Sequence, residues 1–146
     1  DVRGGAPQRL LRTPANEHCG SWSPDGSKLV MESDADGDRD IVVMTVTGQR
    51  RTWLTVNDAR DHLPSWSPDG AEIVFASRRD GNDEIYVIDR DGEGLRNLTN
   101  DPGVDVMARF SPYGRSIVFV SNRGGAFDLY LMSASGRDVR KLEGVR

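Results

Sequence analysis

The hexapeptide Ser-Trp-Ser-Pro-Asp-Gly at residues 21–26 returns unchanged at residues 65–70. A weaker copy, Arg-Phe-Ser-Pro-Tyr-Gly, stands at residues 109–114, so that both steps are 44 residues long. Other positions keep the same step, including Ser33, Ser77, Ser121, Gly37, Gly81 and Gly125. A repeat of this length without insertions indicates one supersecondary unit that is stacked several times along the chain.

The second unit illustrates how each repeat is expected to fold. Turn-forming residues separate four short stretches that are predicted to be strands, at 61–66, 72–77, 84–89 and 95–99. Pro68 has the φ angle that a type I turn requires, and Gly70 lets the chain leave that turn. No stretch of the sequence shows helical periodicity. Each unit is therefore predicted to be a four-stranded antiparallel sheet.

Apolar residues form continuous runs in the predicted second and third strands. Examples are residues 73–76, 117–120, 85–88 and 129–132. A strand with one face in water would alternate apolar and polar residues, so these runs require burial on both faces. Four-stranded sheets that stack face to face provide this burial, and a period of about 40–45 residues is usual for β-propeller blades. The predicted fold class is all-β with three four-stranded blades; a β-sandwich is the less regular alternative.

The residues of the repeat resemble those of the TolB-type propeller family, a relative of the WD repeat. The best match is Ser-Arg-Arg-Asp-Gly-Asn-Asp-Glu-Ile-Tyr at 77–86, which lies between a Trp-Ser-Pro-Asp-Gly turn and a Leu-Thr pair. The first unit departs from this pattern at Ala35 and Val42, and the third departs at Tyr113. These motifs are specific to the fold and say much less about function.

The resemblance implies a propeller, often with six blades, that is a non-catalytic scaffold for protein or peptide ligands. It also implies a periplasmic or secreted location, with a cytoplasmic location as the alternative. The other function that the resemblance implies is the gating propeller of a prolyl-oligopeptidase-like hydrolase. In that case the catalytic domain would lie outside this sequence.

The sequence is expected to form one partial propeller domain over residues 1–146. Its blades are predicted at about 15–55, 59–99 and 103–143, with an N-terminal clasp strand at about 8–13. Propellers typically have four to eight blades, and three blades would leave an apolar face open at each end. We expect two chains to close a six-bladed ring as a homodimer. The alternative is a longer polypeptide that supplies the missing blades.

The composition argues against several classes of function. The chain has 19 basic and 23 acidic side chains, for a net charge of −4, and so lacks the basic footprint of a nucleic-acid-binding protein. No stretch approaches the roughly 18 apolar residues of a spanning helix, so membrane insertion is not expected. The nucleophile motif Gly-x-Ser-x-Gly is absent, and the single cysteine, Cys19, allows no internal disulfide. We therefore expect no enzyme activity.

Three acids share one position of the repeat, at the start of the predicted first strands: Glu17, Asp61 and Asp105. His18 and His62 follow two of them. The first strand of a blade lines the propeller axis, so six carboxylates would surround one mouth of the channel in the dimer. Such a ring favours a basic peptide or a divalent cation such as Ca²⁺. The alternative is that these acids hold turns or salt bridges within the blades.

A second, weaker metal candidate lies in the hairpin that follows the second predicted strand of the first unit. Asp34, Asp36 and Asp38 alternate with other residues around Gly37, as in half of a calcium-binding loop. The loop lacks the glutamate that such a motif places at its twelfth position. A solvated acidic hairpin is the alternative.

Two further expectations concern packing. Asp40, Glu84 and Asp128 share one repeat position, and Arg79 and Arg123 share another. The acid and the arginine of one blade could form an ion pair, or the acid could contact the next blade. The aromatic residues before the Pro turns are expected to wedge between blades as part of the core. These aromatic residues are Trp22, Trp66 and Phe110.

Overall fold

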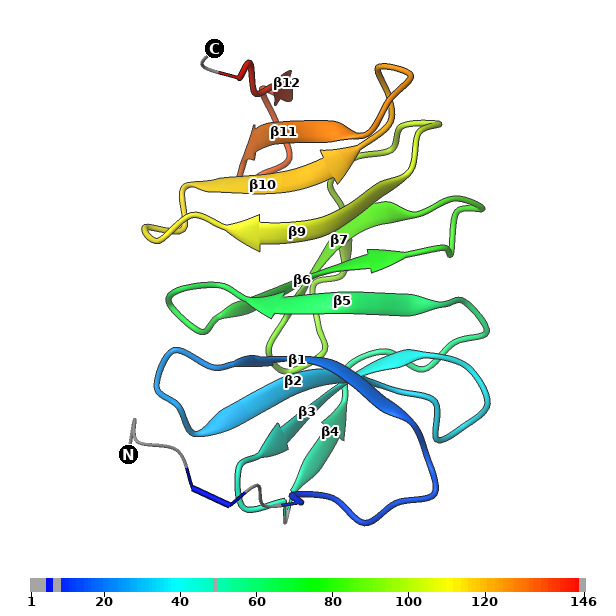
Figure 1. Cartoon of the computed structure of the whole chain (residues 1–146), viewed down its shortest axis with the longest axis vertical. Helices are drawn as coiled ribbons and strands as arrows, with labels where there is room; N and C mark the ends of the chain where they lie inside the picture. The colour runs from blue at the N-terminus through cyan, green and yellow to red at the C-terminus, as the bar shows by residue number, and fades with distance from the viewer. Residues whose placement is uncertain (1–4, 7–8, 49, 145–146) are drawn as a thin grey trace.

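The computed structural model describes residues 5–6, 9–48 and 50–144, and its regular structure in these residues consists of strands (Figure 1). The twelve strands are β1 (Glu17–Trp22), β2 (Lys28–Ser33), β3 (Asp40–Thr45), β4 (Arg51–Trp53), β5 (Asp61–Trp66), β6 (Glu72–Ser77), β7 (Glu84–Asp89), β8 (Arg96–Asn97), β9 (Asp105–Phe110), β10 (Ser116–Ser121), β11 (Asp128–Ser133) and β12 (Arg140–Lys141). No helix of the described residues is long and apolar enough to cross a membrane.

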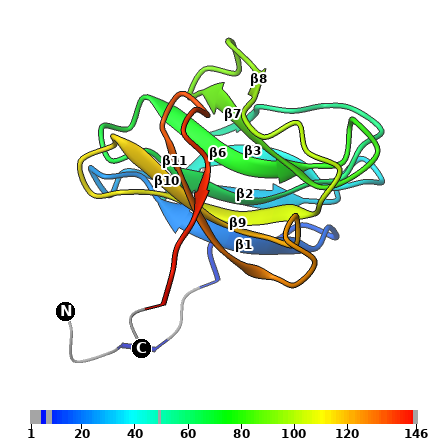
Figure 2. The same ribbon diagram turned by 90° about the horizontal axis from the view of Figure 1, so that it is seen from above.

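The strands form three antiparallel four-stranded sheets, each built from consecutive strands in the order β1 to β4, β5 to β8, and β9 to β12. Figure 1 shows the three sheets stacked one above another, with the chain passing from each sheet to the next. The first strands β1, β5 and β9 lie on the same side of the stack (Figure 1), and Figure 2 shows β1 and β9 along one edge from above. The prediction of three four-stranded blades is confirmed, and we call the sheets blades 1, 2 and 3.

The Pro turn between the first and second strands is closed by side-chain hydrogen bonds. In blade 2 the hydroxyl of Ser67 donates to Asp69 at 2.6 Å, and the N–H of Glu72 donates to that hydroxyl at 2.9 Å. Gly70 has a φ of 70°, which a residue with a side chain adopts only at a cost. In blade 3, Tyr113 takes the place of the aspartate and is 89% exposed, so this turn lacks the carboxylate.

The three blades are connected by two apolar cores. Each blade packs what we call its leading face against the preceding blade; in blade 2 this face consists of Trp66, Ile73, Phe75, Tyr86 and Ile88. It packs what we call its trailing face against the following blade; in blade 1 this face consists of Val30, Ile41, Val43 and Leu54. The interface between blades 2 and 3 uses the same repeat positions.

Burial follows the number of neighbours that each blade has. Strands β6 and β7 of the middle blade are buried over nearly their whole length, as the continuous apolar runs require. In β10 and β11 of blade 3, buried and partly exposed residues alternate, because no blade covers the trailing face. Blade 1 also lacks one neighbour, but its β2 and β3 stay mostly buried, because Leu11 and Trp53 pack against Met31, Val42 and Met44.

Two of the three aromatic residues that were expected to pack between blades do so. Trp66 is 7% exposed between blades 1 and 2, and Phe110 packs against the core between blades 2 and 3. Trp22 is 60% exposed, contrary to the expectation, because no blade packs against the leading face of blade 1. Part of that face, Met31 and Met44, is covered instead by Leu11 and Trp53.

The expected clasp strand at 8–13 is not a strand in the structure. Gln8 lies outside the described residues, and residues 9–13 make no ladder, because the sheet edge that would pair with them is not present. The segment nevertheless occupies the position of a preceding fourth strand. A Cβ built on Gly48 would lie 2.9 Å from the carbonyl oxygen of Leu10, just as one on Gly136 would lie 2.8 Å from that of Leu98.

Candidate functional site

Asp61, the second of the three acids that begin the first strands, is fully buried in an ion pair. The guanidinium of Arg79 lies 2.9 Å from its carboxylate and also donates to Ser77 at 2.8 Å. Asn57 donates to the same carboxylate from the other side, at 2.9 Å. Arg79 thus pairs with Asp61 and not with Glu84. Glu84 instead accepts a hydrogen bond from the backbone N–H of Asp101, in the connection to blade 3, at 2.9 Å.

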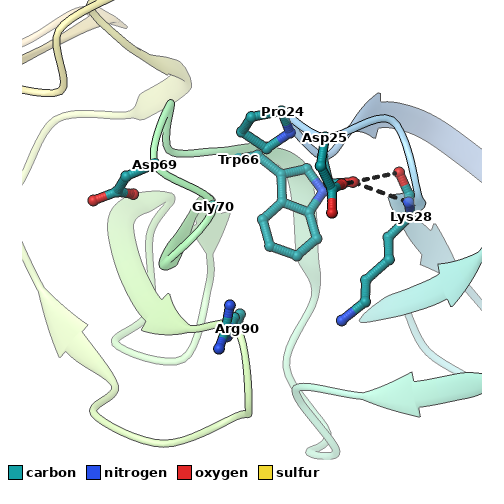
Figure 3. Close-up of a pocket in the computed structure, with 8 residues that line it drawn as sticks. Pro24, Asp25, Lys28, Trp66, Asp69, Gly70 and Arg90 are labelled. Carbon is teal, nitrogen blue, oxygen red and sulfur yellow. Dashed lines mark hydrogen bonds between the residues drawn. The ribbon is translucent and has the colours of Figure 1, made fainter.

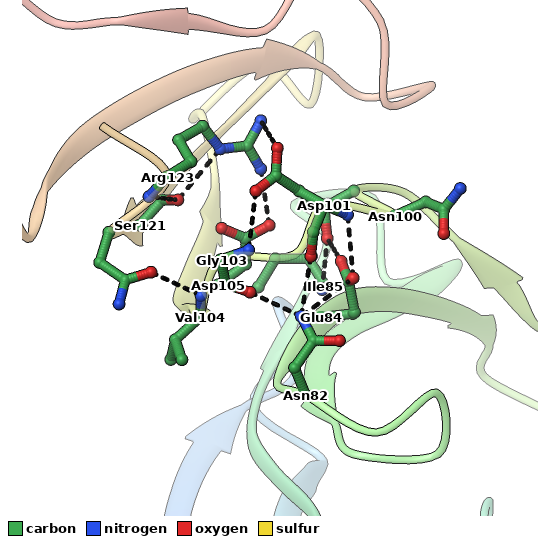
Figure 4. A network of polar contacts seen from close by, with 12 residues as sticks. Asn82, Glu84, Ile85, Asn100, Asp101, Gly103, Val104, Asp105, Ser121 and Arg123 are labelled. Carbon is green, nitrogen blue, oxygen red and sulfur yellow. Dashed lines mark hydrogen bonds and ion pairs between the residues drawn. The ribbon is translucent and has the colours of Figure 1, made fainter. Parts of the chain in front are cut away.

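Blade 3 repeats this arrangement around Asp105, which is also fully buried. Arg123 lies 2.6 Å from Asp105 and donates to Ser121 at 3.0 Å (Figure 4). Its guanidinium lies 5.2 Å from the ring centre of Phe119. Burial of a carboxylate is tolerated because the arginine supplies an opposite charge at hydrogen-bonding distance. Asp61 and Asp105 are therefore bound to arginines and are not offered to a ligand from solvent.

Glu17 and His18 lie apart from this arrangement, at the open side of blade 1. Ala35 stands where blades 2 and 3 have their arginine, and Glu17 pairs instead with Arg51, at 3.1 Å. His18 is exposed. Both residues line a cavity of about 490 Å³ between blade 1 and the N-terminal segment, which contributes Leu11 to its wall. The structure therefore places Glu17 and His18 together and gives Asp61 and Asp105 separate partners.

His62 is buried and joins the second blade to its own hairpin. Its Nε2 lies 2.8 Å from Asp83, and Arg78 contacts the other oxygen of that carboxylate at 2.9 Å. Burial by itself raises the pKa of Asp83, but the hydrogen bonds from Arg78 and His62 outweigh it, so the net pKa is lowered. His62 is thus a structural partner within blade 2.

The acidic hairpin of blade 1 differs from its prediction in one member. Asp34 is held by Asn16, whose N–H and side-chain amide both donate to it at 2.7 Å. Asp36, Asp38 and Asp40 instead offer carboxylate oxygens that lie within 4.8 Å of one another. Burial, followed by contact with Asp36 and repulsion from Asp61, raises the pKa of Asp40. Alternation of acids in the sequence indicated this cluster, but only the fold decides that Asp40 replaces Asp34.

A smaller pocket of about 130 Å³ lies between the Pro turns of blades 1 and 2 (Figure 3). Trp66 forms one wall, and its indole N–H is buried without a hydrogen-bond partner among the described residues. Lys28 and Arg90 lie at the rim (Figure 3). A water takes up roughly 30 Å³ of liquid volume, so this space suits a few waters and is too small for a peptide.

Each of the two outer blade faces exposes a large apolar side chain. The trailing face of blade 3 exposes Leu129 to 51%, whereas Ile85 at the same repeat position of blade 2 is fully buried. The leading face of blade 1 exposes Trp22 to 60%. Analysis of the sequence predicted open faces but did not name these residues. The 44-residue step identifies them once the internal interfaces are known.

Stacked four-stranded antiparallel sheets with their first strands along one edge define an arc of a β-propeller. Within this class, the TolB β-propeller domain family matches residues 61–144, which is more than half of the chain. The chain therefore belongs to the TolB β-propeller domain family.

Solved structures agree with this assignment. A TolB from Agrobacterium tumefaciens has 30% sequence identity and a TM-score of 0.85 over 94% of this chain. A TolB from Acinetobacter baumannii has 29% identity and a TM-score of 0.81 over 91% of this chain. A puromycin hydrolase has 17% identity and a TM-score of 0.75 over 94% of this chain, a likeness that shows the fold alone. No curated protein shows significant similarity.

The chain is shorter than these relatives. It spans 52% of the Agrobacterium protein, 33% of the Acinetobacter protein and 23% of the hydrolase. Activities and partners of the whole relatives are therefore not transferred by the match alone.

Proposed function

We propose that this chain is a non-catalytic TolB-like scaffold that closes a ring with a second copy and binds a protein or peptide ligand. The observation that carries the proposal is that no blade packs on the leading face of blade 1 or on the trailing face of blade 3, which leaves Trp22 and Leu129 exposed. At both interfaces inside the chain, a trailing face of one blade packs against a leading face of the next. By resemblance to the family, we place the protein in the periplasm or outside the cell.

The open faces match the internal interfaces position by position. The leading face of blade 1 consists of Trp22, Leu29, Met31, Val42 and Met44, which correspond to the residues of blade 2 that pack on blade 1. Within one chain Trp22 is exposed, whereas Leu11 and Trp53 already pack against Met31, Val42 and Met44. The trailing face of blade 3 consists of Val118, Leu129, Leu131 and Leu142, which correspond to the residues of blade 1 that pack on blade 2. Apolar residues at every one of these positions support burial of both faces.

Two copies can bury all four open faces at once. Blade 3 of each copy would pack on blade 1 of the other, so the contact closes after two subunits and leaves no free face. Two chains with three blades each would form six blades, which lies within the usual range for propellers. The first strands of both copies would then surround one axial opening, which is where we place the ligand.

The N-terminal segment supports this arrangement, but in the dimer it would compete with β12 for the same place beside β11 of the partner. Leu10 stands next to Gly48 as Leu98 stands next to Gly136, so residues 9–13 take the place of a fourth strand in the blade before blade 1. In the dimer that blade is the partner's blade 3, where β12 already pairs with β11. We propose that residues 9–13 clasp across the junction and displace the two-residue strand β12.

Light scattering of the purified chain tests the assembly directly. We expect a mass twice the 16.1 kDa of one chain, and the Leu129→Glu variant should reduce it to one chain, because the charge would be buried in the junction. Val56→Glu is the matched control: Val56 is 73% exposed in a loop outside both faces, and this variant should stay dimeric. A wild-type monomer at the highest soluble concentration would contradict the proposal.

The ligand part of the proposal is tested after the assembly. We expect capture of peptides by the dimer to be lost in the monomeric Leu129→Glu variant and kept in Val56→Glu. If both variants captured the same peptide library equally well, ligand binding would not require the closed ring, and this part of the proposal would be wrong. The Glu17→Gln variant then tests whether Glu17, which lines the cavity at the open side of blade 1, contributes to that binding.

A further inference from the structure

We propose that the β2–β3 hairpin of blade 1 binds one divalent cation, with Ca²⁺ preferred, through the carboxylates of Asp36, Asp38 and Asp40. Their oxygens lie within 4.8 Å of one another. Two oxygens that each lie about 2.4 Å from a shared Ca²⁺ can be at most about 4.8 Å apart, so a common ion fits this spacing.

Asp40, the buried member of the three acids, has a carboxylate oxygen that lacks a hydrogen-bond partner in the described part of the chain. Asp40 is fully buried, yet its oxygen Oδ2 has no hydrogen-bond donor among the described residues. Its other oxygen accepts a hydrogen bond from Thr55 at 2.8 Å. A buried carboxylate oxygen without a donor is costly. A cation at the three carboxylates would supply the partner that Oδ2 lacks.

In blade 2, hydrogen bonds from side chains take the role at the equivalent positions that we assign to a cation in blade 1. Glu84 stands at the repeat position of Asp40, and the amide of Asn82 donates to it at 3.2 Å (Figure 4). The same amide donates to the carbonyl oxygens of Asp101, at 2.8 Å, and Gly103, at 2.6 Å. Asn82 therefore places an NH₂ group at a point where three acceptors converge.

Blade 1 has Asp38 at the position of Asn82, which removes this donor and adds a negative charge. An ionised carboxylate can only accept hydrogen bonds. The acceptor at the position of Glu84 is retained as Asp40. Because Asp38 replaces the amide donor with another acceptor, the oxygens that converge here are suited to bind a cation.

The donors of the third acid have also been replaced. In blade 2, Asp80 accepts hydrogen bonds from the hydroxyl of Tyr86 and from the amide of Asn97. Asp36 stands at the position of Asp80, but the corresponding neighbours are Val42 and Trp53, which offer no hydroxyl or amide group. All three positions are thus acidic in blade 1, and the donors that Tyr86, Asn97 and Asn82 provide in blade 2 are absent. The hydroxyl donor of Thr99 is kept as Thr55.

Two arginines of this region are already paired with other acids. Arg39, within the hairpin, lies 3.0 Å from the buried Glu32. Arg79, across the blade interface, is paired with Asp61. In blade 3 the repeat positions of Asp36 and Asp38 are Gly124 and Ala126, so the proposed site belongs to blade 1. Three carboxylates with water as the remaining ligands give an expected Kd of about 10⁻⁴–10⁻³ M, as in extracellular calcium modules.

Calorimetric titration of the chelator-treated chain with CaCl₂ tests the site. We expect one Ca²⁺ per chain for the wild type. Asp38→Asn should weaken binding at least tenfold, because it removes one charge and restores the amide found in blade 2. Without Ca²⁺, the same variant should raise the Tm by about 2–4 °C, since Asp40 gains a donor.

Controls separate this site from other carboxylates. Asp91→Asn removes the same charge from a side chain that is 79% exposed on another turn, and it should bind Ca²⁺ like the wild type. Asp36→Asn, at an exposed position that tolerates change, should lose binding as Asp38→Asn does. No binding by the wild type at 10 mM Ca²⁺ (about ten times the expected upper Kd), or unchanged binding by Asp38→Asn, would overturn the proposal.

Discussion

Arg79 donates to both carboxylate oxygens of Asp61, at 3.1 and 2.9 Å, and its guanidinium lies 4.8 Å from the ring centre of Tyr86. The first and third strands of blade 2 are thus joined by one side chain that comes from the hairpin between β6 and β7. Blade 3 repeats the arrangement with Arg123 and Asp105. This pair occupies the position where the sequence suggested an open ring of acids.

Removal of the arginine should be costly because it leaves a buried carboxylate without its partner. We expect Arg79→Ala to lower the free energy of unfolding by about 3 kcal/mol. Arg90→Ala is the control, since Arg90 lies 3.8 Å from an exposed Asp91 and such surface pairs contribute less than about 1 kcal/mol. Urea unfolding at pH 7 measures both. Equal losses in the two variants would contradict the structural role of Arg79.

Blade 1 lacks this arginine, and restoring it should stabilise the protein. Ser33 Oγ is buried without a partner among the described residues, whereas Ser77 at the same repeat position accepts from Arg79 at 2.8 Å. We expect Ala35→Arg to raise the free energy of unfolding by about 0.5–1.5 kcal/mol, measured in the presence of a chelator. Ala71→Arg, at an exposed turn, should change it by less than about 0.5 kcal/mol. A destabilised Ala35→Arg variant would show that blade 1 cannot accept the arginine.

Acid should weaken the contact of Asp83 with Arg78 and His62. The net lowering of the pKa of Asp83 means that the folded state holds its carboxylate ionised more strongly than the unfolded state does. This stabilisation is present above the unfolded-state pKa of about 3.9. It is lost as the pH falls through the lower folded-state value. The loss of stability in Asp83→Asn should therefore be constant above about pH 5 and shrink below about pH 4, in urea unfolding across that range. A pH-independent loss would assign the effect to packing.

Replacement of Gly136 by alanine should cost more stability than replacement of Gly26, because the backbone of Leu98 lies close to Gly136 and no described residue lies close to Gly26. Gly136 has a φ of 80°, and an added Cβ would lie 2.8 Å from the carbonyl oxygen of Leu98. Gly26 has a φ of 69° and open space around it. We expect Gly26→Ala to cost about 1 kcal/mol from backbone conformation alone. Gly136→Ala should cost about 1–3 kcal/mol more, because the blades must separate. Thermal unfolding compares the two, and equal costs would mean that this contact is loose.

Tryptophan fluorescence should report ring closure. Trp22 is 60% exposed in one chain, whereas Trp66 at the same repeat position is 7% exposed beneath the preceding blade. We expect acrylamide quenching to fall as the protein concentration rises through the dimerisation range, and Trp22→Phe to abolish this change. A concentration-independent quenching profile, with a dimer present by light scattering, would place the dimer contact elsewhere.

The periodic part of the fold was readable from the residues. The boundaries predicted for three strands of the second unit, 61–66, 72–77 and 84–89, are those of β5, β6 and β7. Turn residues and apolar runs are local signals, and a 44-residue step repeats them three times, so errors in one unit are corrected by the others. The fourth strands are shorter than expected, because only two or three residues of each pair with a neighbour.

The candidate sites depended on contacts between segments far apart in the chain. A shared repeat position could not show that Asp61 is neutralised by Arg79, 18 residues away, while Glu17 pairs with Arg51, 34 residues away. It also could not show that Asn16 withdraws Asp34 from the acidic hairpin.

The sequence alone determined the class of the fold, the number of blades and which residues share a position, because period and polarity are properties of the chain order. The tertiary structure decided which acids are buried, which have partners and which faces remain open. Those properties depend on the distance between side chains brought together by sheet stacking, and both desolvation and ion pairing change steeply over a few ångströms.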